Sequence, residues 1–164
     1  MQMLSTTGQP DLPAVSAVTD AVLTASRALV AVAARSLASI DTEVTLPQYR
    51  ALVVLASHGP KHVGQLAEAL GVHASTATRL CDRLVSKKLV RRAISRGNRR
   101  ETTVSLTDGG RQIVDEVTAV RRVEIERIVG RIPVKLREPT VTALAAFSEA
   151  AGEVADRAWT LGWS

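Results

Sequence analysis

The chain has 164 residues, one cysteine and a net charge of +5. A single cysteine excludes an intrachain disulfide, and no uncharged apolar run reaches the roughly 18 residues that span a bilayer, so we expect a cytoplasmic protein without membrane contact. Hydrophobic residues make up 46% of the chain and aromatic residues 2%, which favours helices packed through Ala, Val and Leu.

The first part of the chain predicts a tail followed by a long helix. Residues 1–12 are polar and include Gly8 and Pro10, which is typical of a mobile tail. Apolar residues then recur every three or four positions, so we expect an amphipathic helix from about Pro13 to Ser39. Such a length is unusual in a small globular domain and indicates helix–helix association.

Three shorter helices are expected next, over Pro47–Ser57, Val63–Leu70 and Ala74–Lys87. Thr45 suits the N-cap of the first, with Pro47 in its first turn, and Gly59-Pro60 ends it. Gly71 ends the second helix, because glycine adopts the left-handed conformation at low cost.

The hydrophobic period then changes from that of a helix to that of a strand. Residues 89–95 and 101–107 predict two strands joined by a hairpin loop, in which Gly97-Asn98 suits positive φ. Thr107 is a candidate N-cap for a helix to about Val129. A last helix is expected from about Pro133 to Trp159, kinked or split by Pro139.

Positive charge is concentrated in one stretch. From Arg79 to Arg100 there are nine basic residues and one acid, Asp82, while the rest of the chain holds 12 basic and 15 acidic residues. Such a concentration indicates a polyanionic partner. A solvated basic face is the alternative interpretation, but this run lies inside a patterned motif.

The motif is a helix-turn-helix over residues 63–84. Gly71 lies at the turn, Ala67 is small enough for close helix crossing, and Val72 is expected to fill the turn. The second helix has an apolar stripe at Ala77, Leu80, Cys81 and Leu84. Its other face is polar and cationic, as in a recognition helix that enters the major groove. An ordinary helical hairpin with a polar surface is the alternative.

The predicted DNA-contacting residues lie on that helix and on the hairpin loop, whose arginines suit a minor groove or phosphates. They are His73, Ser75, Thr76, Thr78, Arg79 and Arg83 on the helix, and Arg96, Asn98, Arg99 and Arg100 on the loop.

The segments VGQLAEALGVHASTATRLCDRLVSKKLVRR and TTVSLTDGGRQIV, with a basic loop between them, resemble the MarR family of winged-helix regulators. The resemblance implies a mainly α fold with a small β-hairpin wing: a winged helix-turn-helix domain at 46–106 and a helical dimerisation region at 13–45 and 107–164. It also implies an obligate homodimer on a pseudo-palindromic operator. Such proteins usually repress, and many release double-stranded DNA when a small aromatic or phenolic effector binds.

Two positions depart from the family pattern. Family members usually carry Asp-x-Arg in the wing, and here Arg100 matches the arginine while Asn98 replaces the acid. The usual wing ion pair is therefore absent or altered. Pro139 is the second departure, in the dimerisation region.

A dimer is also favoured by the apolar residues themselves, since the first and last helices carry more of them than one small domain can cover. Those of the last two helices are Val117, Val120, Ile125, Ile128, Val129, Leu144, Phe147 and Trp159. The resemblance places Arg35, Tyr49 and His58 near the junction with the DNA-binding part, so they are the candidate effector contacts.

Other chemistry is less well supported. His58 and His62 are separated by Gly59-Pro60 and share no helical face, so we expect no metal and no cofactor. Cys81 lies on the buried stripe, where cysteine behaves as a small hydrophobe. No catalytic motif is present, which argues against an enzyme. Two alternatives stay open: a DNA-binding protein without a ligand response, constitutive or architectural, and a helical dimer whose partner is another protein.

Overall fold

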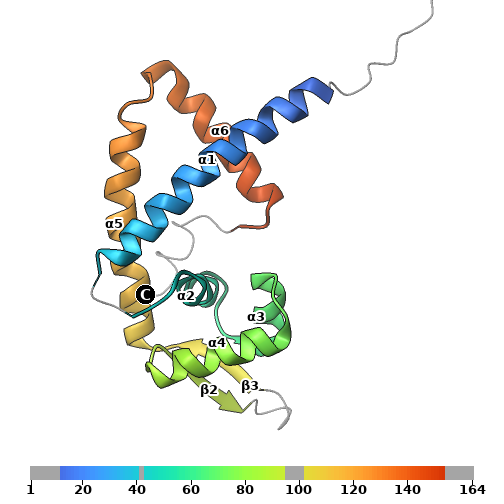
Figure 1. Cartoon of the computed structure of the whole chain (residues 1–164), viewed down its shortest axis with the longest axis vertical. Coiled ribbons are helices and arrows are strands. Elements are labelled where there is room, and N and C mark those ends of the chain that lie inside the picture. Colours follow the sequence, from blue (N-terminus) through green and yellow to red (C-terminus); the bar gives the residue numbers. More distant parts are fainter. Residues whose placement is uncertain (1–11, 41–42, 95–101, 154–164) are drawn as a thin grey trace, which may run out of the picture.

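A computed structural model describes residues 12–40, 43–94 and 102–153. The elements in chain order are α1 (Leu12–Ala38), α2 (Leu46–His58), β1 (Lys61–His62), α3 (Val63–Leu70), α4 (Ala74–Ser86), β2 (Val90–Ile94), β3 (Thr102–Leu106), α5 (Asp108–Val129) and α6 (Val134–Ala150). Helices α2, α3 and α4 lie with the sheet at one end of the molecule, and α5 leads away from them to α1 and α6 (Figure 1). The predicted fold class, mainly helical with a small β wing, is confirmed.

The sheet has one more strand than we predicted. Its order is β1-β3-β2, with antiparallel pairing in which Lys61 lies opposite Val104 and Arg92 opposite Val104 on the other side. The short β1 pairs only through Lys61 and His62. Two residues are too few to show the alternation that identifies a strand in a sequence, so the prediction of a two-stranded hairpin was incomplete.

Two predicted helix boundaries are confirmed, the end of α3 at Gly71 and the beginning of α5 at Thr107. Gly71 has φ 64° and ψ 35°, the left-handed conformation that ends α3. Thr107 caps α5: its hydroxyl accepts from the Gly110 amide at 3.1 Å and donates to the Lys88 carbonyl at 2.7 Å. At Gly110 a Cβ would lie 2.1 Å from the Leu89 carbonyl oxygen, so only glycine lets α5 begin this close to the chain before β2.

The core is formed where α2, α3, α4, the sheet and the first half of α5 meet. Its largest fully buried side chains include Leu52, Leu66 and Leu84 from the three short helices, with Val104 from β3 and Val114 from α5. Val72 at the turn is an exception: it is exposed, so the expectation that it fills the turn is wrong. The small Ala67 and Ala77 are buried there instead and allow α3 and α4 to approach closely.

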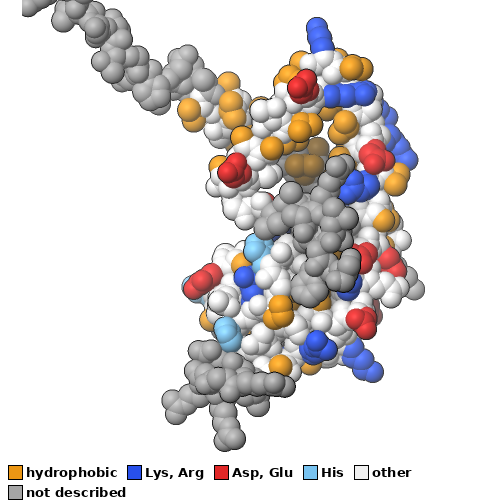
Figure 2. Space-filling view, turned by 180° about the vertical axis from the view of Figure 1, so that it is seen from behind, with side chains coloured by type: hydrophobic (Ala, Val, Ile, Leu, Met, Phe, Trp, Pro, Cys, Tyr) orange, Lys and Arg blue, Asp and Glu red, His pale blue; other side chains and the backbone are white. Residues whose placement is uncertain are grey.

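The flanking helices bury far less. Among the described side chains of α1, only Val32, Ser36 and Leu37 near its end are buried, where α1 packs against α5, and α6 has no buried residue. In the view of Figure 1, α6 and α1 overlap at the end of the molecule away from the sheet, and Figure 2 shows hydrophobic side chains at the surface of that end. Among the described residues, the α1 segment Val15–Ala38 is long and apolar enough to cross a membrane by length and composition alone.

The last helix is shorter than predicted. It ends at Ala150, where the amides of Gly152 and Glu153 donate to the carbonyls of Glu149 and Ser148, and Gly152 has φ 72°. Trp159 lies outside the described residues. Of the two predicted outcomes at Pro139, the split does not occur, because α6 continues through this residue. Its missing amide would have bonded the Lys135 carbonyl, which lies on an exposed helix where water can take that place.

Candidate nucleic-acid interface

Helix α4 is held by one face and free on the other. Ala77, Cys81 and Leu84 are fully buried in the core, and Leu80 packs against it. Because a helix repeats every 3.6 residues, the residues between these buried positions lie on the opposite face and point outward. The predicted contact residues His73, Ser75, Thr76, Thr78, Arg79 and Arg83 are all exposed. The first of them, His73, is the N-cap residue of α4.

The outward side chains make few contacts within the protein. The Thr78 hydroxyl donates to the Ala74 carbonyl at 2.9 Å, and Arg79 Nε donates to the Ser75 carbonyl at 3.4 Å, both within the helix. Neither Arg79 nor Arg83 forms an ion pair with a residue that the structure describes. Within the described part of the chain, the exposed face of α4 therefore carries two cations without a counterion.

On the wing side of α4, charge is neutralised. Arg92 in β2 forms an ion pair with Asp82 at 2.7 Å, and its Nη2 donates to the Thr78 carbonyl at 3.4 Å. This contact joins the wing to the recognition helix, and we did not predict it. The available signal was Asp82 itself, an isolated acid in a strongly basic stretch, but which of the nearby arginines it pairs with depends on the sheet register.

Cys81 is buried on the stripe, as predicted. Burial raises the pKa of its thiol, while the Arg92 guanidinium acts in the opposite direction. A thiol with a raised pKa is protonated at neutral pH and a poor nucleophile.

On the other side of α4, a cavity of about 260 Å³ opens against the beginning of α2. It is lined by Thr45, Pro47, Gln48, Thr76, Arg79, Leu80 and Arg83. Gln48 is buried: its Oε1 accepts from the Thr45 amide at 3.1 Å and lies 3.5 Å from Lys87 Nζ. We did not predict that the beginning of α2 contributes to this face, because segments this far apart in sequence carry no common pattern.

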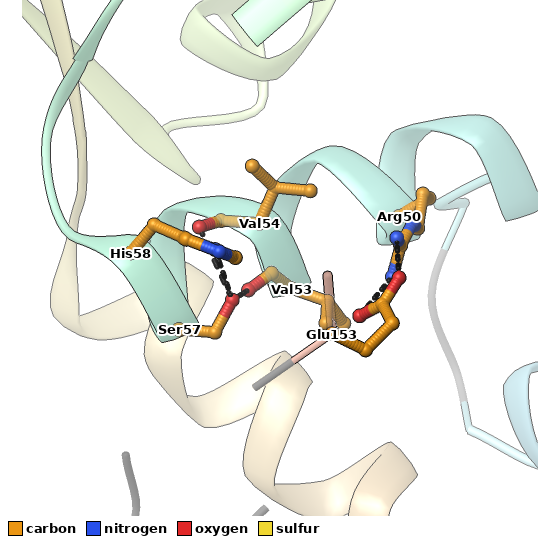
Figure 3. Close-up of polar contacts among 6 residues, drawn as sticks. All are labelled: Arg50, Val53, Val54, Ser57, His58 and Glu153. Carbon is orange, nitrogen blue, oxygen red and sulfur yellow. Dashed lines mark hydrogen bonds and ion pairs between the residues drawn. The ribbon is translucent and has the colours of Figure 1, made fainter. Parts of the chain in front are cut away.

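The three candidate effector contacts lie in different surroundings. Arg35 forms an ion pair with Glu124 of α5. Tyr49 is buried, and its hydroxyl has no hydrogen-bond partner within the described part of the chain. His58 is exposed at the end of α2, with Nδ1 2.8 Å from the Ser57 hydroxyl (Figure 3). Nine residues correspond to two and a half helical turns, so Tyr49 and His58 point to opposite sides of α2.

A further polar contact ties the end of α6 to α2. Glu153 pairs with Arg50, and its second carboxylate oxygen lies 3.5 Å from the same guanidinium (Figure 3). Both side chains are nearly half exposed, so this pair contributes little to stability.

The predicted wing contacts Arg96, Asn98, Arg99 and Arg100 lie outside the described residues. The three histidines are placed apart: His58 ends α2, His62 is in β1 and His73 precedes α4. Within residues 12–40, 43–94 and 102–153, no group of three or more His, Cys, Asp or Glu side chains could hold a metal ion.

A recognition helix with an exposed cationic face, a tight turn before it and an antiparallel sheet after it define a winged helix-turn-helix protein. Residues 42–101 match the family model described as "MarR family". The structure of a MarR family protein from Bacillus stearothermophilus shares the fold with a TM-score of 0.77 at 20% identity, covering 88% of this chain and 100% of that one. The chain belongs to the MarR family.

Two further proteins are similar in sequence. RV1404 from Mycobacterium tuberculosis, known from a crystal structure, is 46% identical, with a TM-score of 0.80 over 87% of this chain and 97% of that one. MdtR, an HTH-type transcriptional repressor of Bacillus subtilis, is 37% identical over 84 residues, which are 51% of this chain and 54% of MdtR. The match to this repressor thus spans about half of each protein.

Proposed function

We propose that this protein is a cytoplasmic, sequence-specific DNA-binding repressor that acts as a homodimer. The observation that carries the proposal is the exposed face of α4, where Ser75, Thr76 and Thr78 accompany Arg79 and Arg83, which have no ion pair with a described residue. Hydroxyl groups reach phosphates and base edges, and an arginine can bind guanine through two hydrogen bonds. Asp82 lies on the same helix, but Arg92 neutralises it.

The homodimer is supported by the helices that bury little in one chain. Leu29 of α1 and Leu144 and Phe147 of α6 are each about half exposed. Apolar side chains repeated at this density along two helices are expected to meet another apolar surface. A twofold dimer would place two recognition helices about 34–36 Å apart, which is one turn of DNA, and so match a pseudo-palindromic operator.

Release of DNA by a small aromatic or phenolic effector is the finer part of the proposal. The DNA binding of BpsR from Bordetella bronchiseptica, which shares this fold at 23% identity and a TM-score of 0.62, is regulated by 6-hydroxynicotinic acid. In this chain, the support is the buried Tyr49 hydroxyl, which lacks a partner among the described residues. A buried hydroxyl without a hydrogen bond is costly, and a polar ligand group could satisfy it.

The proposal is tested by fluorescence anisotropy with the DNA that lies upstream of the protein's own gene. We expect Arg79→Ala to reduce discrimination against altered bases by about 1–3 kcal/mol, because it removes the side chain that would bind guanine. Arg100→Ala should instead weaken binding to all sequences and lower the salt dependence. If both variants bound this DNA as the unchanged protein does, the assignment of α4 and the wing would be wrong.

The effector is tested separately, by adding small aromatic acids and phenols to the preformed complex. A compound that releases DNA from the unchanged protein should act more weakly on Tyr49→Phe, which keeps the ring and removes the hydroxyl. If no compound in such a panel released DNA, the alternative of a DNA-binding protein without a ligand response would be favoured.

A further inference from the structure

The cavity between the beginning of α2 and α4 has no role in the DNA contacts proposed so far, which involve only α4 and the wing. We propose that it binds one backbone phosphate of the DNA, at the edge of the major groove away from the wing. The residues that would hold it are Arg83 and Thr76 of α4, with Gln48 forming the wall on α2. This inference rests on the proposed DNA binding and assigns to it a second element, α2.

Among the described residues that line the cavity, the only charged side chains are cations. Arg79 and Arg83 are four residues apart and therefore share a side of α4, where two like charges repel each other. Among the described residues, no carboxylate lines the cavity, and neither guanidinium has an ion pair with any of them. Lys87 adds a third cation near Gln48. An anion placed here would relieve the repulsion and could accept charge-assisted hydrogen bonds.

The position of the cavity on α4 selects a backbone phosphate rather than a base. On a helical projection, the buried stripe of Ala77, Cys81 and Leu84 lies opposite Ser75 and Arg79, which point straight out. Thr76 and Arg83 lie on one flank of that outward face, and Thr78 lies on the other, where Arg92 of the wing contacts it. When the outward face enters a groove, its flanks meet the phosphates on either side.

The two flanks of α4, which would face the two sides of the groove, differ in charge. On the wing side, Asp82 of α4 is paired with Arg92, so among the described residues α4 carries no unpaired charge on that flank. On the α2 side, Arg83 has no ion pair with a described residue and stands beside a cavity large enough for a phosphate group. Of the two flanks of α4, the α2 flank is therefore the one on which the helix itself carries an unpaired cation that could bind an anion, as far as the described residues go.

Gln48→Glu tests the inference with little change to the fold. Glutamate at this third helical position keeps the oxygen that accepts from the Thr45 amide, and glutamate is a favoured residue there. It also places a negative charge on the cavity wall. We expect about a tenfold loss of affinity for duplex DNA, because a charge-assisted contact is opposed. The control is Gln112→Glu, which adds the same charge on the exposed side of α5.

Arg83→Gln provides an independent measurement. Removing one phosphate-binding cation from each protomer, and thus two from the dimer, should reduce the magnitude of the slope of log K against log salt concentration by about 1.8. A panel of duplexes in which single phosphates are replaced by neutral methylphosphonates then locates the phosphate that Arg83 binds. Among the phosphates whose replacement weakens binding of the unchanged protein, one per half-site should have little or no effect on the binding of Arg83→Gln.

The outcomes separate this inference from the proposed function. If the unchanged protein did not bind DNA, the proposed function would fail first. If it bound, but Gln48→Glu equalled Gln112→Glu and no methylphosphonate distinguished Arg83→Gln, the cavity would not be a phosphate site on DNA. Stabilisation by inorganic phosphate that required Arg83, with DNA affinity unchanged in both variants, would overturn it in favour of a free anion.

Discussion

The region from α2 to β3 and the two helices α1 and α6 bury apolar surface in different ways. In the first, leucines such as Leu52, Leu66 and Leu84 are fully buried although the helices are short. In the second, the helices are longer, yet Leu144 and Phe147 are half exposed. The first region buries its large apolar residues within one chain. The second carries an apolar surface that a single chain leaves exposed.

The largest expected effect compares one leucine from each region. Leu84→Ala should lower the free energy of unfolding by about 2–5 kcal/mol, because it leaves a cavity in a packed core. Leu144→Ala, at a side chain 53% exposed, should cost less than about 1 kcal/mol. Urea unfolding followed by circular dichroism, at low protein concentration, measures both. Equal losses would show that α6 is packed within one chain as tightly as α4.

The second prediction concerns what covers α6. Phe147→Glu should weaken self-association by at least about 2 kcal/mol, or roughly 30-fold in the dissociation constant, because it places a charge in an apolar interface. Thr142→Glu is the matched control, since it adds the same charge on the face of α6 that also carries Glu138 and Glu149. Analytical ultracentrifugation measures both. A dimer of unchanged stability in Phe147→Glu would contradict the proposed role of this face.

The same contrast explains how much could be predicted from the sequence. In the region from α2 to β3, the residues that are buried are also the ones that the local pattern marks. The predictions confirmed here are the buried stripe of Ala77, Cys81 and Leu84, the left-handed Gly71 and the cap at Thr107. Each depends on spacing along a few residues. The boundary of α6 was not predicted, because its apolar residues continue past Ala150 while its capping turn at Gly152 has only a weak local signal.

Contacts between distant segments were also missed. The pairing of Arg92 with Asp82 depends on how β2 lies against α4, and the cavity wall at Gln48 depends on how α2 lies against α4. Several arginines were available for one acid, and no spacing rule selects among them. The candidate site could therefore be predicted as a helix face, but not as two flanks with different charge.

The third prediction tests the rigidity of the wing side. Arg92→Met and Asp82→Asn, alone and together, form a double-mutant cycle for their ion pair. We expect a coupling of about 0.2–1 kcal/mol in the free energy of unfolding, because Asp82 is 54% exposed and water screens the pair. Chemical denaturation at low and high salt measures it, and the coupling should shrink as salt rises. Additive effects would mean that the pair does not join the wing to α4.

The smallest expected effect is on the pH dependence of the free energy of unfolding, through Cys81, and it appears only at alkaline pH. The pKa of this thiol is raised in the folded state, so the folded protein binds the proton more tightly than the unfolded chain does. The stability that this proton provides is complete below the unfolded pKa, which is close to 9.0, and is lost as the pH rises from there towards the folded value. At neutral pH the contribution therefore does not vary.

The measurement is urea unfolding of the unchanged protein and Cys81→Ala from pH 7 to 9.3. Their difference in unfolding free energy should be constant near neutral pH and change by no more than about 0.6 kcal/mol by pH 9.3, with the unchanged protein losing stability faster. The constant part reflects the cavity left by the sulfur and is not the test. A difference that already varied between pH 7 and 8 would mean that the thiol ionises near neutrality, as in a reactive cysteine, and that burial beside Leu84 does not control its pKa.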